Sequence, residues 1–184
     1  MLGQISAALA QAWGGPVGPL ALEHRCPACG AGGHGVPTLC GLPAGRTALV
    51  SVAHVRDART RTRLRLGAWW APPAPSGRPP RAAGLGLDVE RVDAPAFAAA
   101  DGLGAVAFST AERGRLRALP PAERPAARAR LWTRKEALVK AAGTGFTGDP
   151  AAVDALVAPA GVVLLDLAGR LPDGLVGAVA FRPA

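Results

Sequence analysis

The chain has 184 residues, of which 49% are hydrophobic and 18% charged, and its formal net charge is +8. This composition excludes a disordered chain, because nearly half of the residues can be buried in one compact domain or two small halves. The positive charge favours an anionic partner such as phosphate, nucleic acid or an acidic protein. No long apolar run and no basic signal-peptide start occur, so we expect a soluble, cytoplasmic protein without a membrane partner.

A short helix and an irregular stretch come first in chain order. Residues 2–13 have the spacing of an amphipathic helix, whereas residues 14–46 are rich in Gly and Pro and carry few regular signals. Four side chains in this stretch are spaced like the ligands of a small zinc knuckle: Cys26, Cys29, His34 and Cys40. A glycine-rich turn followed by a loop gives the same pattern without a metal, so both interpretations stay open.

Two strands and a proline-rich segment follow. Residues 47–54 (TALVSVAH) predict a buried strand, and residues 60–66 (TRTRLRL) alternate strictly, which predicts a strand with one basic face. That face carries Arg61, Arg63 and Arg65, which solvation alone would also explain. The proline-rich segment 71–83 cannot continue a central strand, so we place the boundary between two halves, 1–83 and 84–184, at its end.

The second half opens with a short apolar strand, residues 84–90 (GLGLDVE), whose last three positions include two acidic residues. Side chains alternate along a strand, so Asp88 and Glu90 share one face. Two neighbouring carboxylates repel unless protons or a cation lie between them, which indicates a site for a hard cation such as Mg²⁺. A strand that ends in solvated acidic residues is the alternative, and this pair alone does not decide between them.

Two helices are predicted next. Ser109 and Glu112 form a capping box, and the helix they open ends at Leu119, before two prolines. The second helix covers residues 125–142 and ends at Gly143.

The second helix contains the only two lysines of the chain, in WTRKEALVK. Trp132, Glu136 and Lys140 share a face, and Lys135 is offset from it by one position. We expect Trp132 to pack in the core. An ion pair between Glu136 and Lys140 would be worth only about 0.3–0.5 kcal/mol if exposed, and it does not explain why lysine occurs nowhere else.

Three ordered blocks, GLDVE, FSTAE and WTRKEALVKAAGTGF, lie within about residues 84–150. Together they resemble the 4′-phosphopantetheinyl transferase superfamily, specifically its longer, surfactin-synthetase-activating (Sfp-type) branch. The resemblance implies an enzyme that transfers the 4′-phosphopantetheine arm of coenzyme A to a serine of an apo acyl or peptidyl carrier protein and releases adenosine 3′,5′-bisphosphate. It also implies that Asp88, Glu90 and Glu136 hold Mg²⁺ against the pyrophosphate, with Glu136 as general base.

The resemblance further implies that Lys135, Lys140 and His54 contact phosphate oxygens of coenzyme A, and that Lys140 is a catalytic residue together with Glu136. The chain departs from the family at Val36, where members often have a basic residue, and at Ala53, where they have a hydroxyl. Other cations would then supply the contact to the 3′-phosphate, and the candidates are Arg25, Arg46 and the arginines of the basic strand face.

The fold implied by the resemblance is an α+β pseudo-dimer of two similar halves, each a small antiparallel sheet packed with a long helix, with the active site in the cleft between halves. Residues 161–167 and 174–181 fit this fold as an antiparallel strand pair. We expect a monomer and no nucleic-acid partner. Two alternatives stay open: a zinc-knuckle-like basic nucleic-acid-binding protein, and an inactive family member that binds carrier proteins.

Overall fold

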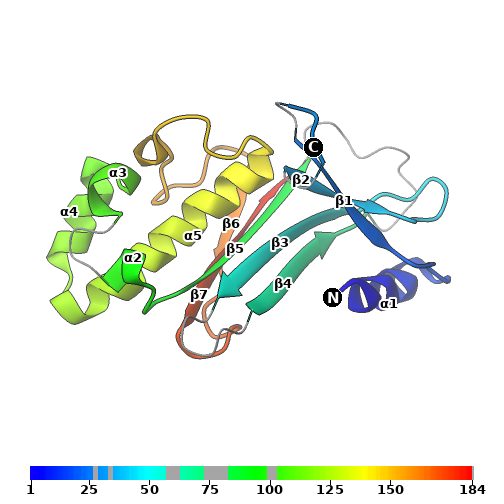
Figure 1. Ribbon diagram of the computed structural model, residues 1–184, viewed down its shortest axis with the longest axis horizontal. Helices are drawn as coiled ribbons and strands as arrows, with labels where there is room; N and C mark the ends of the chain where they lie inside the picture. The colour runs from blue at the N-terminus through cyan, green and yellow to red at the C-terminus, as the bar shows by residue number, and fades with distance from the viewer. Residues whose placement is uncertain (27–28, 33–34, 57–62, 73–82, 99–102, 184) are drawn as a thin grey trace.

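The computed structural model describes residues 1–26, 29–32, 35–56, 63–72, 83–98 and 103–183. The fold is α+β, with two antiparallel sheets and one long helix (Figure 1). The first half contains α1 (Leu2–Trp13), β1 (Ala21–Arg25), β2 (Val36–Cys40), β3 (Leu49–Arg56) and β4 (Arg63–Trp70). The second half contains β5 (Gly84–Arg91), α2 (Pro95–Ala98), α3 (Gly104–Ala107), α4 (Thr110–Ala118), η1 (Pro121–Glu123), α5 (Arg124–Ala142), η2 (Pro150–Ala152), β6 (Val163–Asp166) and β7 (Leu175–Arg182).

The first sheet has the strand order β1-β2-β3-β4, and α1 packs on it through Ile5 and Leu9. The predicted helix 2–13 and the predicted strand at 47–54 are therefore confirmed, the strand beginning at Leu49. The alternating strand begins at Arg63, and its predicted residues 60–62, with Arg61, lie outside the described residues. Residues 14–46 carry few regular signals in the sequence, yet β1 and β2 form a hairpin there that was not predicted.

The second sheet has the order β5-β7-β6, and the predicted pairing of its last two strands is confirmed. Helix α5 lies across β5 and β7 (Figure 1). Glycines make this approach possible: a Cβ on Gly86 would lie 2.7 Å from Ala141 N and overlap Ala137 O, and one on Gly84 would overlap Ala141 O. The face of β5 that begins with these glycines continues to its carboxylates, so the glycine spacing brings α5 close to the acidic side chains.

The two predicted helices of the second half are confirmed at both ends. Ser109 caps α4 in a capping box with Glu112, and α5 ends where Gly143 adopts a left-handed conformation with φ 74°. Proline at the start of α5 is tolerated because the first helical N–H groups have no partner within the helix.

The two sheets meet where β3 lies beside β5, each presenting apolar side chains to one shared core. Ala53 and Val55 of β3 pack there with Leu87 and Val89 of β5. The Ser51 side chain bridges the strands, because its hydroxyl accepts a hydrogen bond from Leu87 N at 2.9 Å. Each half thus has one sheet and at least one helix, although α1 has 12 residues and α5 has 19.

Candidate functional site

Asp88 and Glu90 lie on the face of β5 that α5 covers, as the strand alternation predicted. Their neighbours Leu87 and Val89 point into the core on the other face and are 3% and 1% exposed. Asp88 is itself buried, and its Oδ2 is the only buried side-chain N or O atom of the described residues that has no hydrogen-bond partner. A buried carboxylate oxygen without a donor is unusual in a folded protein and indicates a functional group.

Lys140 and Glu136 come to this carboxylate from α5. Lys140 Nζ lies 2.7 Å from Asp88 Oδ1, donates to Leu87 O at 3.1 Å, and is 3.9 Å from Glu136 Oε2. The predicted i,i+4 pair therefore exists, but the shorter contact of Lys140 is with the strand. The structure brings together four of the expected site residues: Asp88, Glu90, Glu136 and Lys140.

The electrostatics of this carboxylate cluster are unfavourable for three full negative charges. Burial raises the pKa of Asp88 to about 6 even though the Lys140 ammonium opposes the shift. Burial, together with repulsion from Asp88 and Glu136, raises the pKa of Glu90 to about 7. Burial also raises the pKa of Glu136. One lysine does not neutralise the cluster, so it can take up protons or a further cation.

A cleft of about 500 Å³ opens beside the cluster, between the C-terminal end of α5 and the strands of the first half. Glu136 and Lys140 line it from α5, and Thr144 and Gly145 from the chain that follows. The first half contributes residues that include His24, Val36 and His54. A cleft between the halves was expected, whereas no sequence signal singled out His24 or Thr144.

His54 lies in the cleft close to three cations. Arg65 Nε donates to His54 Nε2 at 2.9 Å, which leaves Nδ1 as the nitrogen that carries the proton of the neutral ring. Burial lowers the pKa of His54, and Arg65, Lys140 and Arg63 lower it further. The ring is therefore a neutral donor in an electropositive corner of the cleft.

Two of the expected phosphate contacts lie elsewhere. Arg25 is exposed at the end of β1 and is not among the residues that line the cleft, and Arg46 lies 5.1 Å over the ring of Trp13, at α1. Ala53 is 1% exposed in the core between the sheets, whereas Val36 lines the cleft. Among the proposed substitutes for the family's basic residues, Arg65 contacts a cleft residue through its side chain.

Lys135 points away from the carboxylate cluster. Its Nζ lies 2.8 Å from Glu112 Oε2 and donates to Pro150 O and Val153 O, and both ionic side chains are 0% exposed. An ammonium has three donors, and all three are used here. The structure therefore does not bring Lys135 to the cleft, and the offset of one position along the helix is the reason.

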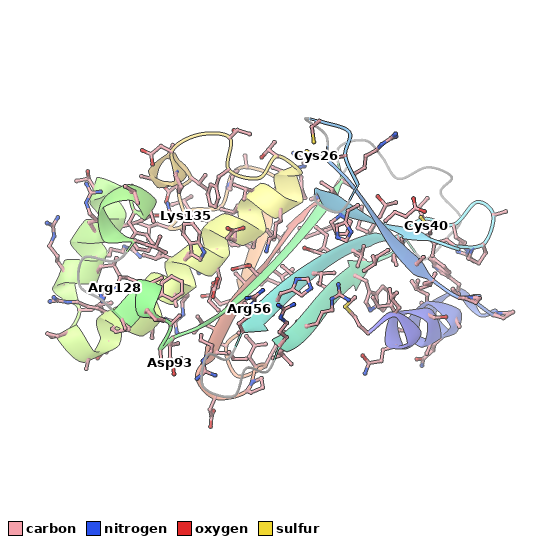
Figure 2. All side chains as sticks on the ribbon, in the orientation of Figure 1. Cys26, Cys40, Arg56, Asp93, Arg128 and Lys135 are labelled. Atoms are coloured by element: carbon pink, nitrogen blue, oxygen red, sulfur yellow. The ribbon has the colours of Figure 1, made fainter. Side chains whose placement is uncertain are left out.

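The cysteines do not form the four-ligand zinc site that their spacing allowed. Cys40 pairs with Ala21 at the far end of the β1-β2 hairpin, whereas Cys26 directly follows Arg25, which pairs with Val36. The two ends are roughly 13 Å apart along a strand, too far for ligands of one zinc ion. Figure 2 shows Cys26 and Cys40 apart. His34 lies outside the described residues, and no three His, Cys, Asp or Glu side chains in the described ranges stand close enough to hold a metal.

Trp132 packs as expected. It is partly buried against the cluster around Phe108 and Leu131, and its ring stacks on Phe146 with centroids 5.3 Å apart.

No helix among the described residues is long and apolar enough to cross a membrane.

In the comparison with known proteins, a family model described as the 4′-phosphopantetheinyl transferase superfamily matches residues 84–175 of the chain. No curated protein matches the chain. The family match covers half of the sequence and includes all three clustered carboxylates and Lys140. The motif order, the carboxylate cluster and this match lead to one conclusion: the chain belongs to the 4′-phosphopantetheinyl transferase superfamily.

Proposed function

We propose that this protein transfers the 4′-phosphopantetheine arm of coenzyme A to a serine of an apo carrier protein and releases adenosine 3′,5′-bisphosphate. The observation that carries the proposal is the cluster of Asp88, Glu90, Glu136 and Lys140, of which Glu136 and Lys140 line the cleft between the halves. Membership of the superfamily supports the same reaction.

Three carboxylates would hold Mg²⁺: Asp88, Glu90 and Glu136. Their fit is supported by Asp88 Oδ2, which is buried without a donor, and by the raised pKa values of all three groups. Carboxylate oxygens are the ligands that Mg²⁺ prefers. Side-chain rotation would have to bring them closer, because they do not stand at ligand distance from one another. The bound ion would neutralise charge on the pyrophosphate during transfer.

The protein's own groups would divide the remaining work. The serine oxygen of the carrier protein would bond to the phosphorus that bears pantetheine while the pyrophosphate P–O bond breaks, and Glu136 would accept the serine proton. A pKa raised by burial suits Glu136 to this role. Lys140 and His54, both in the cleft, would donate to phosphate oxygens.

Several finer points belong to this proposal. We infer an Sfp-type enzyme built as a pseudo-dimer from halves 1–83 and 84–184, monomeric and cytoplasmic. The presence of one antiparallel sheet and a packed helix in each half supports the pseudo-dimer. The net charge of +8 supports an acidic carrier protein as the acceptor.

Mass spectrometry of an apo carrier protein incubated with this protein, coenzyme A and Mg²⁺ tests the proposal. We expect a mass gain of one phosphopantetheine group that requires Mg²⁺. Glu136→Gln should reduce the rate by roughly 10²–10⁴-fold, whereas Glu123→Gln, at an exposed position before α5, should not change it. No mass gain on acyl and peptidyl carriers, with coenzyme A bound, would instead identify an inactive carrier-binding member.

A further inference from the structure

Lys135 and Glu112 form a buried ion pair in which almost every polar atom has a partner. Besides Lys135, Glu112 accepts hydrogen bonds from Ser109 N at 2.7 Å and from Ala155 N at 2.9 Å. Lys135 donates to Pro150 O and Val153 O. The pair therefore joins three parts of the chain: the first turn of α4, the middle of α5, and the segment that follows α5.

That segment, residues 143–155, is attached to α5 by three of its side chains, those of Trp132, Arg134 and Lys135. Phe146 stacks on Trp132, and Arg134 donates to Ala155 O at 2.9 Å. Between these two contacts lie the carbonyls that Lys135 binds. The beginning of the same segment, Thr144 and Gly145, forms part of the wall of the cleft. The position of this wall thus depends on contacts at the buried side of α5.

Burying two charges is costly, and packed apolar side chains of similar volume often stabilise a fold equally well. An ion pair adds a fixed geometry, because the three donors of the ammonium and the four acceptor sites of the carboxylate form hydrogen bonds only in set directions. Here those directions fix backbone atoms of the segment 143–155 relative to Glu136, the next residue along α5.

We propose that Lys135 is a positioning residue: together with Glu112 it fixes the segment 143–155 so that Thr144 and Gly145 hold the shape of the cleft. The identity of the cleft ligand as coenzyme A rests on the proposed function. This role replaces the phosphate contact expected for Lys135, whose three donors are already used inside the protein.

The first test replaces both charges at once, with Glu112→Met and Lys135→Met in one protein. Removing both avoids leaving a lone buried charge, so the double variant should fold. We expect hydrogen exchange at the hydrogen-bonded amides of Thr144, Ala152 and Val153 to become at least tenfold faster, and the Kd for coenzyme A to rise at least fivefold. Unchanged exchange and a Kd within twofold of the wild type would overturn the proposal.

Arg128→Met is the matched control. Arg128 is also a buried cation of α5, but its Nε donates to Phe97 O at 2.8 Å, in a different part of the chain (Figure 2). Loss of this buried cation should leave both exchange at the amides of Thr144, Ala152 and Val153 and coenzyme A affinity unchanged. If Arg128→Met alters them as much as the double variant does, the effect is general destabilisation and the proposal fails.

The second test uses the wild type and does not depend on any variant folding. Because the chain has only two lysines, an amine-reactive label reports on Lys135 and Lys140 separately after digestion. Lys140 is 31% exposed and Lys135 is 0% exposed, so Lys135 should label at least tenfold more slowly. Coenzyme A should protect Lys140. Equal labelling of both lysines would overturn the proposal.

The two proposals fail in different ways. If the wild type binds no coenzyme A, the proposed function fails, while exchange at the amides of Thr144, Ala152 and Val153 still tests whether the ion pair positions the segment. If the wild type binds coenzyme A but the double variant exchanges and binds as the wild type does, only the positioning role fails.

Discussion

Helix α5 pairs each lysine of the chain with a carboxylate, on two different sides. The Lys135–Glu112 contact is 2.8 Å long and the Lys140–Asp88 contact 2.7 Å, so the two ion pairs have nearly the same geometry. They differ in surroundings. Lys135 and Glu112 are 0% exposed, whereas Lys140 is 31% and Asp88 10% exposed. The two lysines are five positions apart, which at about 100° per residue puts them about 140° apart around the helix axis and so on different sides of it.

The comparison separates a structural ion pair from a functional one. All three donors of Lys135 have partners, and Glu112 closes a capping box at the same time. Asp88, by contrast, keeps one oxygen without a donor beside two further carboxylates. The buried pair has no remaining capacity to bind a ligand, whereas the half-exposed pair does. Each pair joins one lysine of α5 to one carboxylate, and burial distinguishes them.

Lys135→Met should give the largest effect. It leaves Glu112 buried without its cation, so we expect the free energy of unfolding to fall by about 3–5 kcal/mol. Urea unfolding followed by circular dichroism measures the change. The double variant with Glu112→Met should recover most of the loss. A single-variant loss below about 1 kcal/mol would place this pair in the same class as exposed ion pairs.

Gly86→Ala should disturb the Lys140–Asp88 ion pair and leave the Lys135–Glu112 ion pair in place. A Cβ at this position overlaps the α5 backbone at Ala137, so the helix must move away from β5, costing about 1–3 kcal/mol. The Lys140–Asp88 contact spans that interface and should lengthen, whereas the Lys135–Glu112 contact lies on the other side of α5. Gly114→Ala, an exposed helix position with no atom near the added Cβ, should stabilise instead by about 0.5–1 kcal/mol. Crystal structures or methyl NMR shifts would show the displacement, and an unmoved α5 in Gly86→Ala would contradict this account.

The carboxylate cluster should make stability depend on pH when divalent cations are removed with EDTA. The pKa values of Asp88 and Glu90 are raised to about 6 and about 7, so the folded protein retains protons that the unfolded chain releases between about pH 4 and 7. The free energy of unfolding contributed by these groups therefore falls as pH rises through that window.

Glu90→Gln tests this dependence. It should remove about 1 kcal/mol of the difference in stability between pH 5 and pH 8, after allowance for the partial exposure of Glu90. Exposed Glu123→Gln is the control and should leave the difference intact. Mg²⁺ should restore wild-type stability at pH 8 and have little effect on the variant. If the free energy of unfolding depended on pH in the same way in both variants, a raised pKa of Glu90 would be contradicted.

The sequence predicted the second half better than residues 14–46 of the first half, for a physical reason. Capping by Ser109, the end of α5 at Gly143 and the alternation that puts Asp88 beside Glu90 are local signals, and all three are confirmed. The hairpin of β1 and β2 was missed because its strands are short and lie among glycines and prolines. Cys26 and Cys40, close in sequence, lie at opposite ends of that hairpin.

The position of Lys135 could not be predicted from local signals. Its partners are Glu112 on α4 and backbone carbonyls beyond α5, so the contact depends on how three separate segments pack. The sequence spacing did show that Lys135 is offset by one residue from the helix face that carries Glu136 and Lys140, and this offset was the one indication that Lys135 has a different role. The role of Glu112 was visible only in part, as a capping residue, because its bond to Ala155 N joins residues 43 positions apart.

Lys140→Met should give the smallest change in stability and thereby completes the comparison. Its ammonium is partly solvated, so we expect a loss of at most about 1 kcal/mol in the free energy of unfolding. Its effect should instead appear in binding, since loss of one charge-assisted hydrogen bond to a phosphate corresponds to roughly tenfold weaker affinity for coenzyme A. Isothermal titration calorimetry and urea unfolding on Lys135→Met and Lys140→Met together measure both quantities. If Lys140→Met destabilised the protein as much as Lys135→Met while binding coenzyme A normally, the half-exposed pair would also be structural, because the two lysines would then differ in exposure but not in role.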